Sequence, residues 1–208
     1  MDERARRTLG HYEANAERFW QGTRDHDVSQ NIDALISAIG RPAPLRILDF
    51  GCGPGRDLMA LKALGHTPVG LDGCASFVRM ARQNSGCEVL EQDFLSLSLP
   101  EKSFDGIFCN ATLFHVPSAE LPRVIGELRA ALVPSGVLLC SNPRGKSEGW
   151  YGERYGCNFE IDRWREAFAG SGFVEIDHYY RPKDQPRESQ PWLVMLFRAT
   201  ATPDIGTR

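Results

Sequence analysis

The chain has 208 residues, of which 42% are hydrophobic and 25% are charged, and its net charge is −3. This length and balance predict a single domain whose core needs no disulfide or metal to hold it, and the charge argues against a broad nucleic-acid-binding surface, which is usually basic. No apolar run reaches the roughly 18 residues of a membrane span, and the charged start lacks the apolar segment of a signal peptide, so we expect a cytoplasmic protein without a membrane partner.

Two helices are predicted before the first strand. Apolar and aromatic residues recur at helical spacing over Tyr12–Phe19, which indicates one N-terminal helix. A second helix is expected over Ser29–Ile39, with Ser29 as its cap and Gly40 at its end. The polar bend 21–27 between them is a candidate lid segment.

Strands and helices alternate after residue 45. Short apolar runs predict strands at 45–50, 68–71, 87–90, 104–109 and 137–140, with helices between them that include 77–84 and one capped by Ser118. A helix at 162–169 and a final pair of strands at 173–179 and 192–198 follow. This order predicts an α/β fold with a doubly wound, largely parallel sheet.

Two stretches of the chain carry no regular pattern. Residues 142–159 form the longest irregular segment, and long loops in compact domains are often functional. We expect the last ten residues to be frayed.

The six cysteines contain no CxxC pair, and the five histidines lack ligand spacing with them. We therefore predict reduced, mostly buried thiols and no metal site.

The most informative segment is Ile47–Asp57, which runs from a strand through a GxGxG turn into a helix. Glycines let the backbone approach a ligand closely, and the helix N-terminus behind them offers free N–H donors. Asp72 stands 21 residues past Gly51, at the end of the next predicted strand, where a carboxylate can accept both hydroxyls of a ribose. The third glycine comes one place earlier than in the dinucleotide fingerprint GxGxxG, and Arg56 occupies the expected slot.

This turn resembles the first motif of class I S-adenosylmethionine (SAM) dependent methyltransferases, in which an acid at the end of an apolar strand precedes GxGxG. Further segments match that family in order and spacing over residues 12 to 180: Asp72, 92–94, 103–108 and 128–138. The chain is similar in particular to the small-molecule type, with a domain like methyltransferase domains 11 and 25.

The resemblance implies a Rossmann-like, doubly wound sheet of seven strands, mostly parallel with an antiparallel last strand, and helices on both faces. It also implies one methyltransferase domain over residues 1–208. Within it we expect an N-terminal helical cap at 1–40, a SAM-binding core at 45–142, and a substrate-side loop with the last strands at 142–200.

The implied cofactor is SAM, with S-adenosylhomocysteine as product and no metal. By resemblance Asp72 holds the ribose, Asp93 meets the adenine amino group and Phe94 packs on the ring. Tyr12 is placed like an aromatic that covers SAM and Arg56 like a partner of the methionine carboxylate, although helix packing and an exposed first turn explain them equally well. Asp49 is expected to organise the glycine turn. The full predicted cofactor set is Tyr12, Asp49, Gly51, Cys52, Gly53, Gly55, Arg56, Asp72, Gly73, Gln92, Asp93, Phe94 and Asn110.

Residues for the methyl acceptor are expected where the fourth and fifth strands end. The fourth strand runs into 110–115, which has Asn110 but lacks both prolines of the motif found in enzymes that methylate base amines. His115 is the candidate general base by position and intrinsic pKa, and the alternative is a structural histidine at a helix start.

Aromatic and cationic side chains after the fifth strand favour a small, flat or anionic acceptor, with Arg144 or Arg154 pairing to a carboxylate. The alternative is a solvated loop without net charge. The predicted acceptor-binding set is Phe114, His115, Asn142, Arg144, Trp150, Tyr151, Tyr155 and Tyr180.

Three functions follow from these patterns. The first is methyl transfer from SAM to a small molecule, such as an N or S atom of an amino-acid-derived heterocycle. The second is methylation of a protein or tRNA, and the third is a non-catalytic SAM-binding partner protein. A nucleic-acid partner is disfavoured, and either a monomer or a homodimer is compatible with the sequence.

Overall fold

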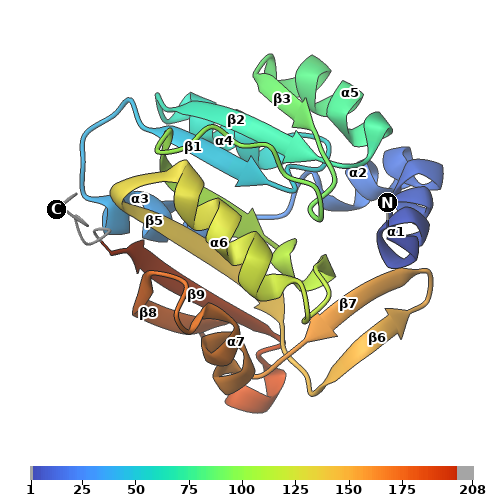
Figure 1. Cartoon of the computed structure of the whole chain (residues 1–208). Coiled ribbons are helices and arrows are strands. Elements are labelled where there is room, and N and C mark those ends of the chain that lie inside the picture. Colours follow the sequence, from blue (N-terminus) through green and yellow to red (C-terminus); the bar gives the residue numbers. More distant parts are fainter. Residues whose placement is uncertain (1, 201–208) are drawn as a thin grey trace, which may run out of the picture.

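Seven strands form one sheet in the computed structural model of the chain, which describes residues 2–200 (Figure 1). They are β1 (Arg46–Phe50), β2 (Thr67–Asp72), β3 (Glu88–Glu91), β4 (Phe104–Asn110), β5 (Leu132–Pro143), β8 (Phe173–Arg181) and β9 (Trp192–Ala199). Their order across the sheet is β3-β2-β1-β4-β5-β9-β8. β1 to β5 pair in parallel, and β9 runs antiparallel to both of its neighbours, β5 and β8. The predicted doubly wound sheet with an antiparallel last strand is confirmed.

Helices cover both faces of this sheet. Ile32, Leu35 and Ile39 of α3 (Ser29–Ile39) pack on one face, which α4 (Arg56–Ala63) and α5 (Ala75–Ser85) also cover. The opposite face is covered by α6 (Leu121–Ala131) and α7 (Ile161–Phe168). Because both faces are buried, the central strands are almost continuously apolar, which is why their sequence pattern was readable.

The predicted N-terminal helix is two helices, α1 (Glu3–Ala14) and α2 (Ala16–Thr23). Asn15 separates them with φ −122° and ψ 17°, and its side-chain amide donates to the His11 carbonyl. An asparagine amide that competes for a backbone carbonyl favours such a break, and the apolar spacing continues across it.

Both predicted serine caps are wrong. The Ser29 N–H donates to Oδ1 of Asp27, so an upstream carboxylate takes the role expected of Ser29. The N–H and hydroxyl of Ser118 both donate to Glu148, which the chain brings from 30 residues away. A long-range carboxylate therefore displaced the local cap.

Residues 142–159 are not an irregular loop. They contain a separate antiparallel hairpin of β6 (Ser147–Tyr151) and β7 (Arg154–Asn158), joined through Gly152 at φ +65°. Figure 1 shows this hairpin beside α1, and the Tyr155 N–H donates to the Thr8 hydroxyl across the contact. The α1 helix and the hairpin together lie over the carboxyl end of the sheet.

No helix within residues 2–200 is both long and apolar enough to cross a membrane. The frayed end expected for the last ten residues falls mostly on 201–208, which lie outside the described residues.

Candidate functional site

A cavity of about 790 Å³ lies at the carboxyl ends of β1, β2 and β4. From β1 the chain crosses to β2 on one side of the sheet, while β4 lies on the other, so the cavity occupies a topological switch point. Ligand cavities of small-molecule enzymes typically measure about 300–1,000 Å³. The position and size are those of a site for a cofactor-sized ligand.

The glycine turn forms the floor of this cavity. A Cβ on Gly51, which has φ +80°, would lie 2.3 Å from Cγ2 of Thr112. Gly55 has φ +96°, and a Cβ there would lie 2.9 Å from Cα of Ala81 in α5. Gly51 and Gly53 line the cavity, whereas Gly55 seats α5 against the turn and lies outside the lining.

Asp72 lies at the end of β2 and faces the cavity although it is almost fully buried. Its Oδ2 accepts the Gly53 N–H at 2.9 Å, and its Oδ1 accepts the Cys74 N–H at 2.9 Å. Burial raises the pKa of this carboxyl to about 6. Each carboxylate oxygen accepts more than one hydrogen bond, so capacity remains for the two hydroxyls of a ribose.

The segment after β3 contributes an acid and an aromatic ring to the wall. Asp93 accepts the Leu95 N–H, and Phe94 stacks on Phe50 with 4.2 Å between ring centroids. Both Asp93 and Phe94 line the cavity. Gln92 does not, because its amide exchanges hydrogen bonds with the backbone of Ser98 and braces the loop.

Of the other predicted cofactor residues near the glycine turn, some line the cavity and one lies behind the turn. Cys52 and Gly73 line the cavity. Asp49 lies behind the turn, fully buried, and its Oδ2 has no hydrogen-bond partner among the described residues. Burial and the nearby Asp57 hold the pKa of Asp49 well above its usual range.

Arg56 is already engaged within the protein. Its Nε and Nη2 donate to the two carboxylate oxygens of Asp57 at 2.6 and 2.9 Å, and its Nη1 donates to the Thr23 carbonyl. Asn110 donates to the same Asp57 carboxylate and accepts from Asn31. Arg56, Asp57 and Asn110 all line the cavity, but the fork expected to hold a methionine carboxylate holds Asp57 instead.

Tyr12 and His115 meet in the wall of the cavity. The Tyr12 hydroxyl lies 2.9 Å from Nε2 of His115, and Nδ1 lies 2.7 Å from the Tyr155 carbonyl oxygen. Because a carbonyl only accepts, Nδ1 carries the proton and Nε2 accepts from Tyr12. Burial lowers the pKa of His115 to about 4. A neutral ring with both nitrogens engaged is a poor general base, so this geometry favours the structural alternative for His115.

The predicted acceptor-binding set is only partly brought together. Phe114 and His115 line the cavity. The structure places the other six outside its lining: Asn142, Arg144, Trp150, Tyr151, Tyr155 and Tyr180.

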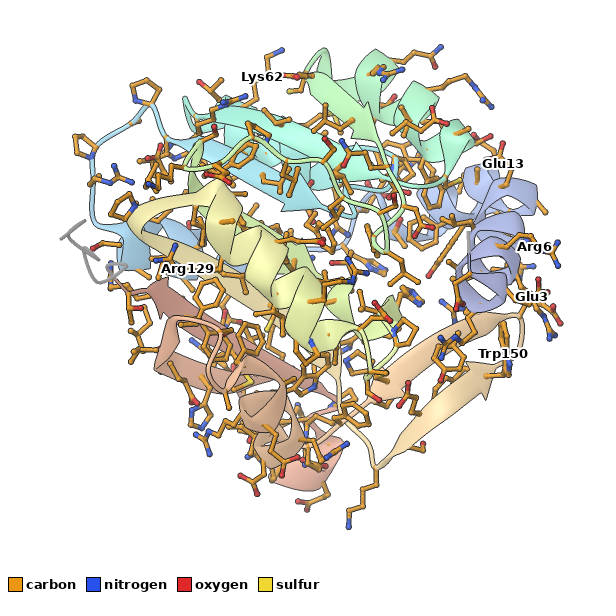
Figure 2. The ribbon with its side chains drawn as sticks, in the orientation of Figure 1. Glu3, Arg6, Glu13, Lys62, Arg129 and Trp150 are labelled. Carbon is orange, nitrogen blue, oxygen red and sulfur yellow. The ribbon has the colours of Figure 1, made fainter. Side chains whose placement is uncertain are left out.

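Each of these six has another environment. Arg144 donates to both oxygens of Glu160 and to two backbone carbonyls, and it lies over the Tyr180 ring. Trp150 lies on the hairpin near α1 (Figure 2). The Arg7 guanidinium lies 4.4 Å from the Trp150 ring centroid. Tyr151 is also exposed, and the Tyr155 hydroxyl donates to Glu148. Asn142 is buried in the sheet, and neither of its amide atoms has a partner in the described part of the chain.

Sequence reasoning missed part of the wall, to which α1 and α2 contribute Leu9, Phe19 and Trp20. The bend, predicted as a candidate lid segment, contributes residues 25–28. The last strands add Arg181, Pro182 and Trp192 to the same wall. The helical spacing from Tyr12 to Phe19 and the neighbouring Trp20 could have indicated this aromatic wall. Only the packing of α1 and α2 shows which helix face is turned toward the cavity.

Within residues 2–200 no three His, Cys, Asp or Glu side chains are grouped so that they could hold a metal ion. All six cysteines are free, and five of them are buried.

The residues present fit the implied cofactor. The turn leaves no room for a side chain at Gly51, a fixed carboxylate stands at the end of β2, and a stacked phenyl ring and an acid follow β3. These groups match a ligand with a diol and a flat heterocycle.

Comparisons with known proteins agree with this geometry. Residues 47–136 match the family described as "Methyltransferase domain". The chain is 32% identical over 117 residues to a trans-aconitate 2-methyltransferase of Variovorax paradoxus (strain S110), which covers 55% of this chain and 44% of that protein. It is also 32% identical over 122 residues to a malonyl-[acyl-carrier protein] O-methyltransferase of Xylella fastidiosa (strain M23), covering 56% and 41%. The chain thus spans less than half the length of these curated relatives.

A crystal structure has the same fold over nearly the whole chain. It is the 1,6-didemethyltoxoflavin-N1-methyltransferase of Burkholderia thailandensis with bound 1,6-didemethyltoxoflavin and S-adenosylhomocysteine. The two superpose with a TM-score of 0.77 at 21% identity, over 95% of this chain and 89% of that one. At this identity the likeness establishes the fold.

Proposed function

We propose that the chain, whose residues 47–136 match a methyltransferase domain, is a class I SAM-dependent methyltransferase that transfers a methyl group from SAM to a small molecule. The observation that carries the proposal is the cavity at the switch point, where the Gly51 turn meets the fixed carboxylate of Asp72.

Residues from four segments would hold SAM. The Gly51–Gly53 backbone admits the ligand, Asp72 accepts from the ribose, and Asp93 with Phe94 meets the adenine. Tyr12 closes the cavity from α1. Arg56, since its donors go to Asp57 and Thr23, acts by holding α2 against the glycine turn.

When bound, SAM supplies an activated methyl group for in-line displacement by a nucleophile. The chain's contribution is then alignment and exclusion of water, which are worth roughly 7 kcal/mol or more in well-oriented reactions. Aromatic walls from Tyr12, Phe114 and Trp192 confine the acceptor, and neutral His115 holds Tyr12 in place. No proton acceptor is required of the chain if the nucleophile arrives with a free lone pair.

For the acceptor we propose a flat molecule, such as an amino-acid-derived heterocycle methylated on N or S. The aromatic lining supports a flat shape, since rings stack on planar ligands. We also propose that the protein acts in the cytoplasm, as a monomer or as a homodimer.

The test is transfer of labelled methyl from SAM after incubation of the purified protein with a cell lysate. We expect label in the low-molecular-weight fraction, and an Asp72→Ala variant should abolish it. Label in protein or RNA instead would favour the macromolecular alternative. SAM binding without label in either fraction would favour a non-catalytic SAM-binding protein.

A further inference from the structure

We propose that the acceptor carries a carboxylate and that Arg154 recognises it. This inference rests on the proposed function, because it assigns the part of the cavity beside Phe114, His115 and Arg154 to the acceptor. A cation can bind such a ligand only if the protein's own acceptors do not already occupy it.

Three arginines line the cavity, and two of them are committed. Arg56 is paired with Asp57. Arg181 donates to the backbone carbonyl of Asp27, and it lies close enough to the Asp27 carboxylate to help lower the pKa of that group. Arg154, on β7, has no ion pair within 4 Å among the described residues, and its recorded contact is a long hydrogen bond of 3.4 Å to the Tyr12 hydroxyl.

The acids of α1, its N-cap and the hairpin all have partners other than Arg154. On α1 and its N-cap, Asp2 pairs with Arg4 and Glu3 pairs with Arg6. Glu13 accepts from Ser76 and Cys74. On the hairpin, Glu153 pairs with Arg7, and Glu148 accepts from Ser118 and Tyr155. Each of these five acids thus has a partner other than Arg154, which has no ion pair among the described residues.

The position of Arg154 in the cavity is defined by its neighbours. Its guanidinium lies 5.9 Å from the Tyr12 ring centroid, and its charge contributes to lowering the pKa of His115. Phe114 stands next to His115 with 4.0 Å between ring centroids. A flat acid stacked near Phe114 would therefore present its carboxylate to the Arg154 guanidinium, whose remaining N–H groups can donate to it.

A guanidinium suits this task because its planar fork matches the two oxygens of a carboxylate. Tyr12 already donates its proton to His115, so its hydroxyl oxygen accepts from Arg154 and orients the fork. The exposed side of Arg154 lets a carboxylate enter without first breaking an internal ion pair.

The test compares flat carboxylic acids with their primary amides on protein saturated with S-adenosylhomocysteine. Benzoate with benzamide and indole-3-carboxylate with indole-3-carboxamide are matched in shape and differ in charge. Calorimetric titration should show at least one acid binding about tenfold more tightly than its amide. In Arg154→Gln that preference should fall below threefold, and Arg154→Lys should keep part of it, since the charge stays and the fork is lost.

The matched control is Arg163→Gln, which removes the same charge from α7, where Arg163 pairs with Glu166 outside the cavity lining. It should behave as the wild type. S-adenosylhomocysteine affinity should be unchanged in all variants.

Three results overturn the inference. They are acids that bind no better than their amides, a preference that survives Arg154→Gln, or an equal loss of S-adenosylhomocysteine affinity in Arg154→Gln, which would place Arg154 on the cofactor. If the wild type fails to bind S-adenosylhomocysteine, the proposed function fails first, and this inference falls with it.

Discussion

The Tyr12 hydroxyl lies 2.9 Å from Nε2 of His115, although 103 residues separate them in the chain. Nδ1 of the same ring donates to the Tyr155 carbonyl on β7. One imidazole therefore ties α1, the end of β4 and the hairpin together around the cavity. His115 therefore holds α1 and the hairpin in fixed positions over the cavity.

Replacing His115 with Gln should change how stability depends on pH. The pKa of His115 is lowered from 6.5 to about 4 in the folded protein, so the unfolded chain takes up a proton first as pH falls. The stability that this group contributes is present above pH 6.5 and is lost toward pH 4. We expect the advantage of the wild type over His115→Gln to shrink by about 1–2 kcal/mol between pH 7 and pH 5. Urea unfolding of both proteins at each pH measures this, and an advantage that is constant with pH contradicts it.

Cofactor affinity should fall in acid because of Asp72. Burial raises the pKa of Asp72 to about 6, so its carboxylate is ionised at pH 7.5 and about nine-tenths protonated at pH 5. We expect S-adenosylhomocysteine to bind about tenfold more weakly at pH 5 than at pH 7.5. Asp72→Asn, which cannot titrate, should bind weakly at both pH values. Parallel pH profiles in the two proteins would rule out Asp72 as the source of the effect.

A methyl group at Gly51 should both strain the turn and obstruct the cavity. Gly51→Ala would combine φ +80° with a Cβ 2.3 Å from Thr112, so we expect a loss of about 2 kcal/mol or more of unfolding free energy. Gly10→Ala is the matched control, because Gly10 lies within α1 with nothing within 4 Å of an added Cβ. That substitution should stabilise the protein by about 0.5–1 kcal/mol. Two variants of equal stability in thermal or urea unfolding would contradict the described turn.

Replacing Arg144 should lower the stability of the protein without changing its affinity for ligands. It joins Glu160 to the backbone carbonyls of Arg187 and Gln190, outside the cavity lining. Arg144→Gln should cost about 2 kcal/mol of unfolding free energy, since several charge-assisted hydrogen bonds are lost. S-adenosylhomocysteine affinity and any acid-over-amide preference should stay at wild-type values. A selective loss of acid binding in Arg144→Gln would show that Arg144 belongs to the acceptor-binding site after all.

The parallel core was predictable because strands buried on both faces are mostly apolar, as are Ile47, Leu48 and Phe50 of β1. The hairpin was not predictable, because its exposed Trp150 and Tyr151 are adjacent and are flanked by glycines and polar residues, a pattern that resembles a loop. Ser29 and Ser118 failed as caps because each helix start meets a carboxylate, one of them far away in sequence.

The same contrast holds for the site. The turn residues and Asp72 lie at strand ends that the motif itself fixes, so they could be placed in advance. Arg144 and Arg154 are ten residues apart in a segment with one composition, yet Glu160 binds the first and the cavity receives the second. Only the orientation of the hairpin against α1 decides between them, and local sequence does not encode that orientation.

The most direct test of the account is calorimetric titration of the purified protein with S-adenosylhomocysteine. We predict saturable binding of one molecule per chain, lost in Asp72→Ala. Absence of binding, together with binding of NAD or another nucleotide, would show that the GxGxG turn serves a different cofactor and would overturn the methyltransferase proposal.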